Sequence, residues 1–141
     1  MVKQILMDFF SGRLKDVKNM AGKNTGHYGE DIAAAYLQQK GYSIVERNYR
    51  KRFGELDIIA EDGEVLVFVE VKTRSSTRFG SPFEAVDSRK QRKMSRIALA
   101  YLNSRKLFDR SARFDVVAVM LHKGSLPEVE IVQDAFEMYG E

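Results

Sequence analysis

The sequence predicts an α/β domain in which a central mixed sheet of about five strands is flanked by helices. The first indication is an Asp-Gly turn between two apolar runs at 54–60 and 65–72, the pattern of a β-hairpin. Helical apolar spacing appears before and after this hairpin, and two further apolar runs follow. The predicted order is helix, helix, three strands, helix and two strands, which is typical of a layered α/β domain.

The composition limits the function classes. The chain has 141 residues, enough for one domain with a substantial core. It contains no cysteine, which excludes a disulfide scaffold and thiolate chemistry and fits a cytoplasmic protein. A net charge of +3 permits a polyanionic partner without requiring one. We predict no signal peptide and no membrane span.

The first 25 residues are predicted to form a helical extension and linker, followed by the α/β domain at 26–141. Apolar residues between 2 and 20 have amphipathic helical spacing. This helix is expected to pack on the domain's own core or on a second copy, and a membrane-surface helix is the alternative. Glycines and an asparagine at 21–26 indicate a linker.

A second helix is predicted at about 27–40, ending before Gly41, with Glu30 in its first turn. An acidic residue there compensates the helix dipole and needs no function. A strand follows at 42–50, and a basic cluster over 47–52 is interleaved with Tyr49 and Phe53. The cluster is interpreted either as a solvated loop or as a phosphate-contacting edge that includes Arg50.

The central hairpin carries charges inside otherwise apolar strands, at Asp57, Glu70 and Lys72. Such charges are costly unless they are paired or bound to a metal. If residues 62 and 63 form the turn, Asp57 falls opposite Phe68 and Glu55 falls opposite Glu70. Asp57 and Glu70 are then diagonal neighbours on one face, roughly 7–8 Å apart at Cα.

Two carboxylates and a lysine on one face suit a hard divalent cation such as Mg²⁺ or Mn²⁺. Asp57 and Glu70 are the expected ligands, with the Val71 carbonyl as a third, and Glu55 is an alternative. Lys72 is expected to orient the attacking water or to stabilise negative charge. The other interpretation is a structural ion pair of Lys72 with one of the carboxylates.

The segment after the hairpin is predicted to be a polar loop at 73–82, followed by a helix at about 84–105 that Asp87 or Ser88 could cap. The first half of this helix is basic, which opposes the helix dipole unless an anionic partner is bound. Further strands are predicted at 113–121 and 129–132. The residues expected to contact a nucleic-acid backbone are Arg50, Arg74, Arg78, Arg89, Lys90, Arg92, Lys93 and Arg96.

Several motifs together resemble the YraN family of bacterial proteins over roughly residues 26–133. They are GEDIAA at 29–34, ERNYR at 46–50, GELD at 54–57, VFVEVKTR at 67–74, EAV at 84–86 and RFDVV at 113–117. This family is similar to archaeal Holliday junction resolvases and so to the PD-(D/E)xK nuclease superfamily.

The resemblance implies a restriction-endonuclease-like three-layer domain with Asp57, Glu70 and Lys72 as its active-site signature. It also implies a catalytic glutamate on the first core helix, a position that Glu30 matches. Two motifs depart from the superfamily pattern. Leu56 replaces the proline before the motif aspartate, and Gln91 is followed four residues later by Ser95 instead of a tyrosine.

Three functions follow as hypotheses. The first is a Mg²⁺- or Mn²⁺-dependent endonuclease acting on DNA, including branched or junction DNA, in which Glu30 supports the metal site or transfers a proton. A junction substrate would require a two-fold homodimer. The second is a non-catalytic nucleic-acid-binding module, and the third is an assembly protein that uses residues 2–20.

Overall fold

A computed structural model describes residues 25–75 and 86–139 of the chain. The helix expected at 2–20, most of the loop expected at 73–82 and Arg78 lie outside these residues. The described elements are α2 (Thr25–Gln39), β1 (Ser43–Lys51), β2 (Gly54–Asp62), β3 (Val65–Arg74), α3 (Ser88–Arg105), β4 (Ala112–Met120) and β5 (Glu128–Val132). Their order and type confirm the predicted five-stranded α/β domain.

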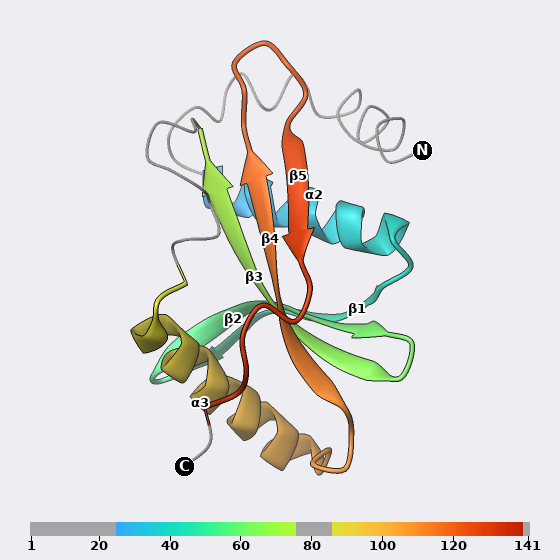
Figure 1. Ribbon diagram of the computed structural model, residues 1–141, viewed down its shortest axis with the longest axis vertical. Coiled ribbons are helices and arrows are strands. Elements are labelled where there is room, and N and C mark those ends of the chain that lie inside the picture. Colours follow the sequence, from blue (N-terminus) through green and yellow to red (C-terminus); the bar gives the residue numbers. More distant parts are fainter. Residues whose placement is uncertain (1–24, 76–85, 140–141) are drawn as a thin grey trace.

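The five strands form one mixed sheet in the order β1-β2-β3-β4-β5 (Figure 1). Neighbouring strands are antiparallel except for β3 and β4, which are parallel and are connected through α3. This parallel pair at the centre is what makes the sheet mixed. It also places the end of β3, where the charged residues stand, at the beginning of the crossover connection.

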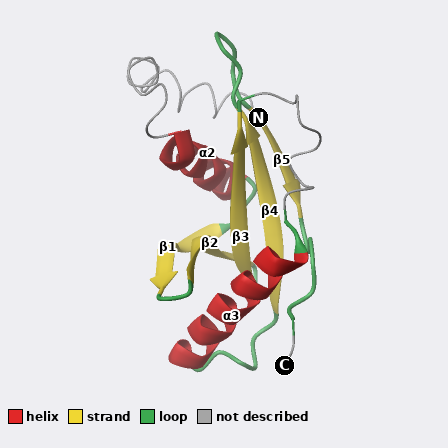
Figure 2. Ribbon diagram, turned by 90° about the vertical axis from the view of Figure 1, so that its left-hand side faces the viewer, coloured by secondary structure: helices red, strands yellow, loops and turns green. Residues whose placement is uncertain are grey.

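The two helices cover opposite faces of the sheet, so the domain has three layers (Figure 2). The α2 side chains pack on the face that presents Ile58, Val69 and Val117. The α3 side chains pack on the other face, against Phe68 and Phe114 among others. Each large apolar side chain buried in these layers contributes about 1.5–3 kcal/mol relative to an exposed one. The layers therefore fix where the N-terminal half of each helix lies relative to β3.

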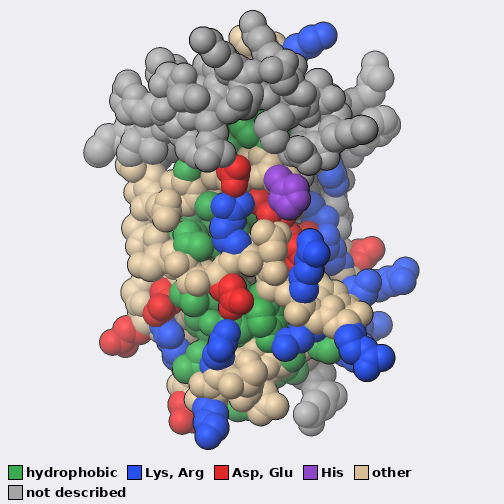
Figure 3. Space-filling view, turned by 180° about the vertical axis from the view of Figure 1, so that it is seen from behind, with side chains coloured by type: hydrophobic (Ala, Val, Ile, Leu, Met, Phe, Trp, Pro, Cys, Tyr) green, Lys and Arg blue, Asp and Glu red, His purple; other side chains and the backbone are tan. Residues whose placement is uncertain are grey.

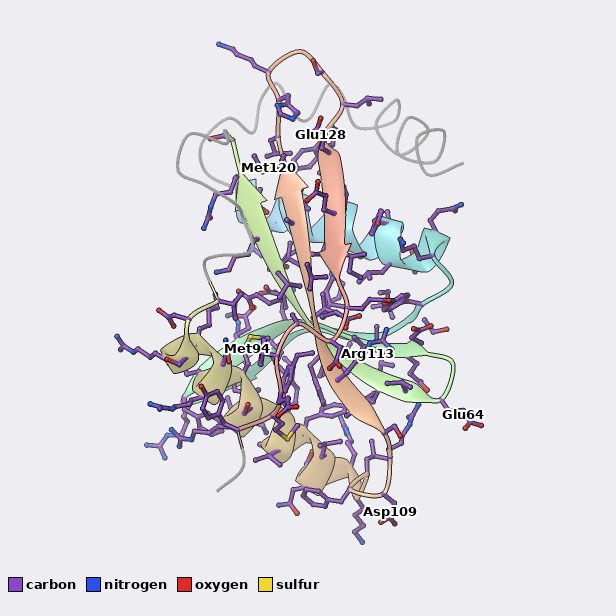
Figure 4. The ribbon with its side chains drawn as sticks, viewed as in Figure 1. Glu64, Met94, Asp109, Arg113, Met120 and Glu128 are labelled. Carbon is purple, nitrogen blue, oxygen red and sulfur yellow. The ribbon has the colours of Figure 1, made fainter. Side chains whose placement is uncertain are left out.

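The β2–β3 hairpin forms where it was predicted, but the predicted register is wrong by two residues. Asp62 pairs with Val65, so the turn residues are Gly63 and Glu64. Gly63 has a φ of 60°, a value that glycine adopts without strain. Glu64 lies at the tip of the turn (Figure 4).

The corrected register changes which charged residues face each other. Ile58 pairs with Val69, so Asp57 stands level with Glu70 and not with Phe68, and the two are neighbours across the strands rather than diagonal ones. Glu55, two residues before Asp57 on β2, is consequently no longer opposite Glu70. Because the error is an even number of residues, it still leaves Asp57 and Glu70 together.

The helix ends follow local signals. α2 ends one residue before Lys40, and Gly41 and Tyr42 donate their N–H groups back to Gln38 and Leu37, as expected for a glycine stop. The predicted start of the next helix at 84 is wrong, because α3 begins at Ser88. Asp87 is extended and its side chain accepts the Lys90 N–H, which confirms Asp87 as the cap.

A buried polar cluster around Asp115 lies on the face of the sheet that α2 covers, and its role is structural. The carboxylate of Asp115 is fully buried and accepts hydrogen bonds from Tyr42 Oη at 2.8 Å and from Arg113 Nε at 2.9 Å. The backbone N–H of Asp134 donates to the same carboxylate at 2.9 Å. Arg113, labelled in Figure 4, also bonds Asp62, so the group ties β4 to the β2–β3 hairpin. The buried carboxylate of Asp115 thus receives hydrogen bonds from three residues of the cluster.

Neither of the described helices is both long enough and apolar enough to cross a lipid bilayer. In α3 the apolar stripe faces the sheet, with Met94 directed inward from its first half (Figure 4). The remaining faces of α3 are polar or charged.

Candidate active site

The structure brings the principal site residues of the sequence prediction into one pocket. It has a volume of about 310 Å³ and lies where the end of β3 passes between the N-terminal half of α2 and the first turn of α3. The prediction that Glu30 lies in the first turn of its helix is wrong, because α2 begins at Thr25 and its first turn contains no acidic residue. Its lining residues are Glu30, Asp57, Glu70, Val71, Lys72, Thr73, Arg74 and Lys90. Residues more than forty positions apart in the chain thus share one pocket because the sheet and the two helices converge there.

Asp57 is held at the point where the β2–β3 pairing ends. Beyond the last pair, of Ile58 with Val69, its Oδ2 accepts the backbone N–H of Val71 at 2.8 Å. Burial, together with the charges of Glu70 and Glu30, raises the pKa of Asp57 to about 8, although the Val71 N–H opposes the rise. In the absence of a cation, this carboxyl therefore retains its proton at neutral pH.

Glu70 is the most buried carboxylate in the pocket, with 7% of its side chain exposed. Lys72 Nζ lies 3.6 Å from its Oε1, and Lys90 Nζ bonds the same oxygen. Burial and the neighbouring charge of Lys90 lower the pKa of Lys72. Burial also acts to lower the pKa of Lys90, but the hydrogen bonds to Glu70 and Lys72 and the charges of Glu70 and Asp57 together raise it. Two lysines thus compensate one buried carboxylate.

A group of three carboxylates lies next to Glu70 and its two lysines. Glu30, Glu55 and Asp57 each offer an oxygen within 4.8 Å of the other two. With its amide nitrogen directed at the group, Asn48 donates to Glu30 Oε2 at 3.1 Å and to Glu55 Oε1 at 2.7 Å. The pKa of Glu30 is raised, mainly by burial and also by the charge of Glu55. His27, Arg47 and Asn48 act in the opposite direction without cancelling the rise. The group places three acidic side chains beside the buried Glu70.

Gly29 explains how α2 brings Glu30 so close to β3. A Cβ atom at Gly29 would lie 1.9 Å from Thr73 Oγ1 and 2.9 Å from Thr73 Cβ, so no larger residue fits at this crossing. Glycine allows the helix backbone to touch the strand, and the next residue, Glu30, then faces the pocket. The GEDIAA motif therefore includes both the contact and the carboxylate that it positions.

The predicted backbone-binding residues in the described part of the chain form two sets, and Arg50 stands apart from both. Arg74 and Lys90 line the pocket, whereas the exposed outer face of α3, which we call the α3 ridge, carries Arg89, Arg92, Lys93 and Arg96. Arg50 is exposed and bonds Glu55 at 2.8 Å. Lys and Arg side chains gather along one side of the molecule in Figure 3. Aromatic rings support the ridge, because Arg96 lies over Phe53 at 4.7 Å and Arg92 over Tyr139 at 5.3 Å.

Sequence reasoning missed two contributions to the pocket. Lys90 was expected only at a nucleic-acid backbone, yet it bonds the central carboxylate. Asn48 was counted with a basic cluster, yet it donates to two of the acidic residues from a left-handed backbone conformation with a φ of 54°. Asparagine tolerates that conformation better than most residues, which was the one available signal.

The donor set of the pocket fits a hard divalent cation. Its acidic lining residues are Glu30, Asp57 and Glu70, and carboxylate oxygens are donors that Mg²⁺ and Mn²⁺ prefer. The pKa of Asp57 is raised first by burial and then by the charges of Glu70 and Glu30, and a bound cation would favour the ionised carboxylate. Val71 lines the pocket, so its carbonyl stays a predicted third ligand.

Comparison with known proteins gives a consistent result. The model of the uncharacterised protein family UPF0102 matches residues 29–119. A UPF0102 protein of Syntrophus aciditrophicus is 54% identical over 117 residues, covering 82% of this chain and 91% of its own. A UPF0102 protein of Moorella thermoacetica is 51% identical, and the match covers 83% of this chain and 98% of the relative. Another, of Rhodococcus jostii, is 50% identical, and the match covers 79% of this chain and 94% of the relative. The chain therefore belongs to UPF0102, the YraN family that its motifs resemble.

Proposed function

We propose that this protein is a Mg²⁺- or Mn²⁺-dependent endonuclease that hydrolyses DNA phosphodiester bonds, with branched or junction DNA as its preferred substrate. The observation that carries the proposal is the pocket in which Asp57, Glu70 and Lys72 meet Glu30. Carboxylates and a lysine at the end of a central strand are suited to metal-assisted hydrolysis of a phosphodiester. The cytoplasm is the expected compartment.

The residues of the chain have distinct roles in this proposal. Asp57 and Glu70 would hold the cation, with the Val71 carbonyl as a third ligand. When bound, the cation lowers the pKa of a water molecule and neutralises phosphate charge. Lys72, close to Glu70 and largely buried, would orient the attacking water and stabilise negative charge as the bond breaks. Glu30, whose carboxylate lies close to that of Asp57, would support the metal site through water or act in proton transfer.

The α3 ridge and the pocket would bind adjacent parts of the DNA backbone. Arg74 and Lys90 face the pocket where the reacting phosphate must lie. The ridge continues this positive surface along the same helix, and the rings of Phe53 and Tyr139 hold two of its guanidinium groups in place. A DNA backbone that is held by these side chains is recognised by its charge and shape rather than by its base sequence. A junction, which has two-fold symmetry, would be cut by a homodimer.

A cleavage assay tests the proposal. The protein is incubated with four-way junction, flap and linear duplex DNA, with and without Mn²⁺, beside the variants Asp57→Asn and Lys72→Ala. The control Asp109→Asn removes an exposed carboxylate from the α3–β4 connection (Figure 4). We expect Mn²⁺-dependent cutting that both site variants abolish and the control retains. Binding without cutting under all metal conditions would refute the endonuclease.

The second candidate is a non-catalytic DNA-binding module that retains the nuclease fold. It is favoured by one observation, which is that two lysines already neutralise Glu70 and leave it without an uncompensated charge. This function predicts DNA binding that is sensitive to salt but insensitive to Mn²⁺ and to Asp57→Asn. The same assay distinguishes the two candidates.

A further inference from the structure

The two lysines at Glu70 are not equivalent. Both approach Oε1, Lys72 at 3.6 Å and Lys90 in direct hydrogen-bond contact. The side chain of Lys72 is 12% exposed, whereas that of Lys90 is 38% exposed. Lys72 belongs to the same strand as Glu70 and has little free space. Lys90 reaches across from α3 and has an open path to solvent.

The backbone of Lys90 is fixed while its side chain is free to move. Its N–H is held by the Asp87 cap at 2.9 Å, so the first turn of α3 does not shift when the ammonium group leaves Glu70. A lysine side chain is long and flexible, and its charge is readily hydrated. The ammonium group of Lys90 can therefore leave the carboxylate of Glu70 by rotations within its own side chain.

A divalent cation and the Lys90 ammonium group would both bind the carboxylate of Glu70. Glu70 is a predicted ligand, and the oxygen that Lys90 bonds is one of the two that it can offer. A cation there would also stand close to the positive charge of Lys90 and repel it. Only one of the two can occupy that oxygen at a time.

We propose that Lys90 competes with the divalent cation for Glu70 and that, once displaced, it binds the substrate phosphate at the mouth of the pocket. This inference rests on the metal site of the proposed function. Lys90 is suited to both positions because it lines the pocket and also belongs to the basic half of α3. The cation-free protein keeps its buried carboxylate compensated, and the same lysine becomes available when the cation arrives.

The first test measures Mn²⁺ affinity by titration calorimetry without DNA. Lys90→Met removes the competing charge but keeps a long side chain, and Lys90→Arg restores the charge. The control Lys40→Met alters an exposed lysine at the far end of α2. We expect Lys90→Met to bind Mn²⁺ tighter, on the order of tenfold, with Lys90→Arg and Lys40→Met close to wild type. Thermal unfolding of each variant checks that it is folded.

The second test measures binding of a four-way junction by fluorescence anisotropy, with Ca²⁺ replacing Mn²⁺. Lys90→Met is expected to bind the junction more weakly than Lys40→Met does, although its cation affinity has risen. This opposite change in the two affinities is what a merely structural lysine would not produce.

The outcomes separate the inference from the function on which it rests. Equal Mn²⁺ affinity in Lys90→Met and wild type would overturn the competition. Tighter Mn²⁺ binding with undiminished junction binding would overturn the phosphate contact. If neither wild type nor Lys90→Met binds Mn²⁺, both the inference and the metal-dependent endonuclease fail. If the competition holds but no DNA is ever cut, only the endonuclease fails.

Discussion

At the scale of single residues, Asp57 carries the largest electrostatic cost in the domain's pocket. It is placed among carboxylates and out of water, and the backbone N–H of Val71 favours its charged form without offsetting these effects. A protein gains no stability from such an arrangement in the absence of a cation. Residues that break the local rules of burial in this way are expected at functional sites.

The first prediction concerns the pH dependence of stability without metal. The pKa of Asp57 is about 8 in the folded protein, against an ordinary value of 3.8. Between these values the folded state holds a proton that the unfolded state has released, so the free energy of unfolding falls as pH rises. The slope is at most about 1.4 kcal/mol per pH unit for one group. Urea denaturation in EDTA from pH 4 to pH 9 measures it.

Asp57→Asn provides the control, because the amide has no proton to lose. The stability of wild type relative to Asp57→Asn should decrease across this window and level off above about pH 8. Added Mn²⁺ should stabilise wild type more at pH 8 than at pH 5, since the cation binds the ionised carboxylate. Parallel stability curves for the two proteins would contradict the raised pKa.

At the scale of elements, the contact between α2 and β3 positions the site. Helix and strand touch at Gly29 and Thr73, and Glu30 and Lys72 flank this contact in the sequence. The chain thus uses one close approach to bring together residues from two layers. A change in that spacing is expected to alter both stability and the geometry of the carboxylates.

The second prediction is that Gly29→Ala lowers the free energy of unfolding by about 1–3 kcal/mol, the range for an overpacked site. The added methyl group would meet Thr73 Oγ1 at 1.9 Å. It should also weaken Mn²⁺ binding, because α2 must move away and take Glu30 with it. Urea denaturation and calorimetry measure the two effects.

Thr73→Ala tests the cause. In the double variant the hydroxyl and methyl groups of Thr73 are gone, although its Cβ remains 2.9 Å from the new methyl group. The double variant should therefore recover part of the stability lost in Gly29→Ala, with a coupling energy of at least about 0.5 kcal/mol. Strictly additive effects would show that the two side chains do not meet.

The elements themselves were largely predictable from sequence. Apolar periodicity located five strands and two of the helices, and Gly41 and Asp87 marked helix ends. The hairpin register was not predictable, because Asp62-Gly63 and Gly63-Glu64 are both acceptable turns and only cross-strand packing decides between them. The charges nevertheless remained together, since the error was even and the side-chain period of a strand is two.

The contacts between elements were less predictable. Lys90 reaches Glu70 only because α3 begins at Ser88 and packs across the end of β3. Asn48 reaches Glu30 from a position in β1 where the backbone is left-handed. Neither relation leaves a pattern in the local sequence, whereas Glu30, Asp57, Glu70 and Lys72 stand in motifs that the family resemblance covers.

At the scale of the whole molecule, charge is distributed unevenly although the net charge is only +3. The acidic residues of the pocket lie beside the basic half of α3, which faces outward. A polyanion that binds along α3 would be positioned with one phosphate at the pocket. Net charge alone conceals this arrangement, which depends on which face of the helix is buried.

The third prediction is that the α3 ridge sets the salt dependence of DNA binding. Each phosphate contact that is lost should reduce the slope of log affinity against log salt by roughly 0.9. The double variant Arg92→Ala with Arg96→Ala should therefore bind more weakly at low salt, and its slope should be smaller by about 2. Fluorescence anisotropy with a junction DNA from 50 to 300 mM salt, in Ca²⁺ to prevent cutting, measures both quantities.

The matched control removes two exposed lysines elsewhere, Lys40→Ala with Lys123→Ala, so that the net charge is the same in both double variants. If the ridge binds the backbone, only the arginine pair changes the slope. If net charge alone attracts DNA, both double variants lose affinity equally, and the α3 ridge has no special role. Because Arg96 and Arg92 also cover Phe53 and Tyr139, thermal unfolding of the arginine pair must be compared with wild type. A changed slope in a protein that unfolds at the wild-type temperature can only be assigned to lost phosphate contacts.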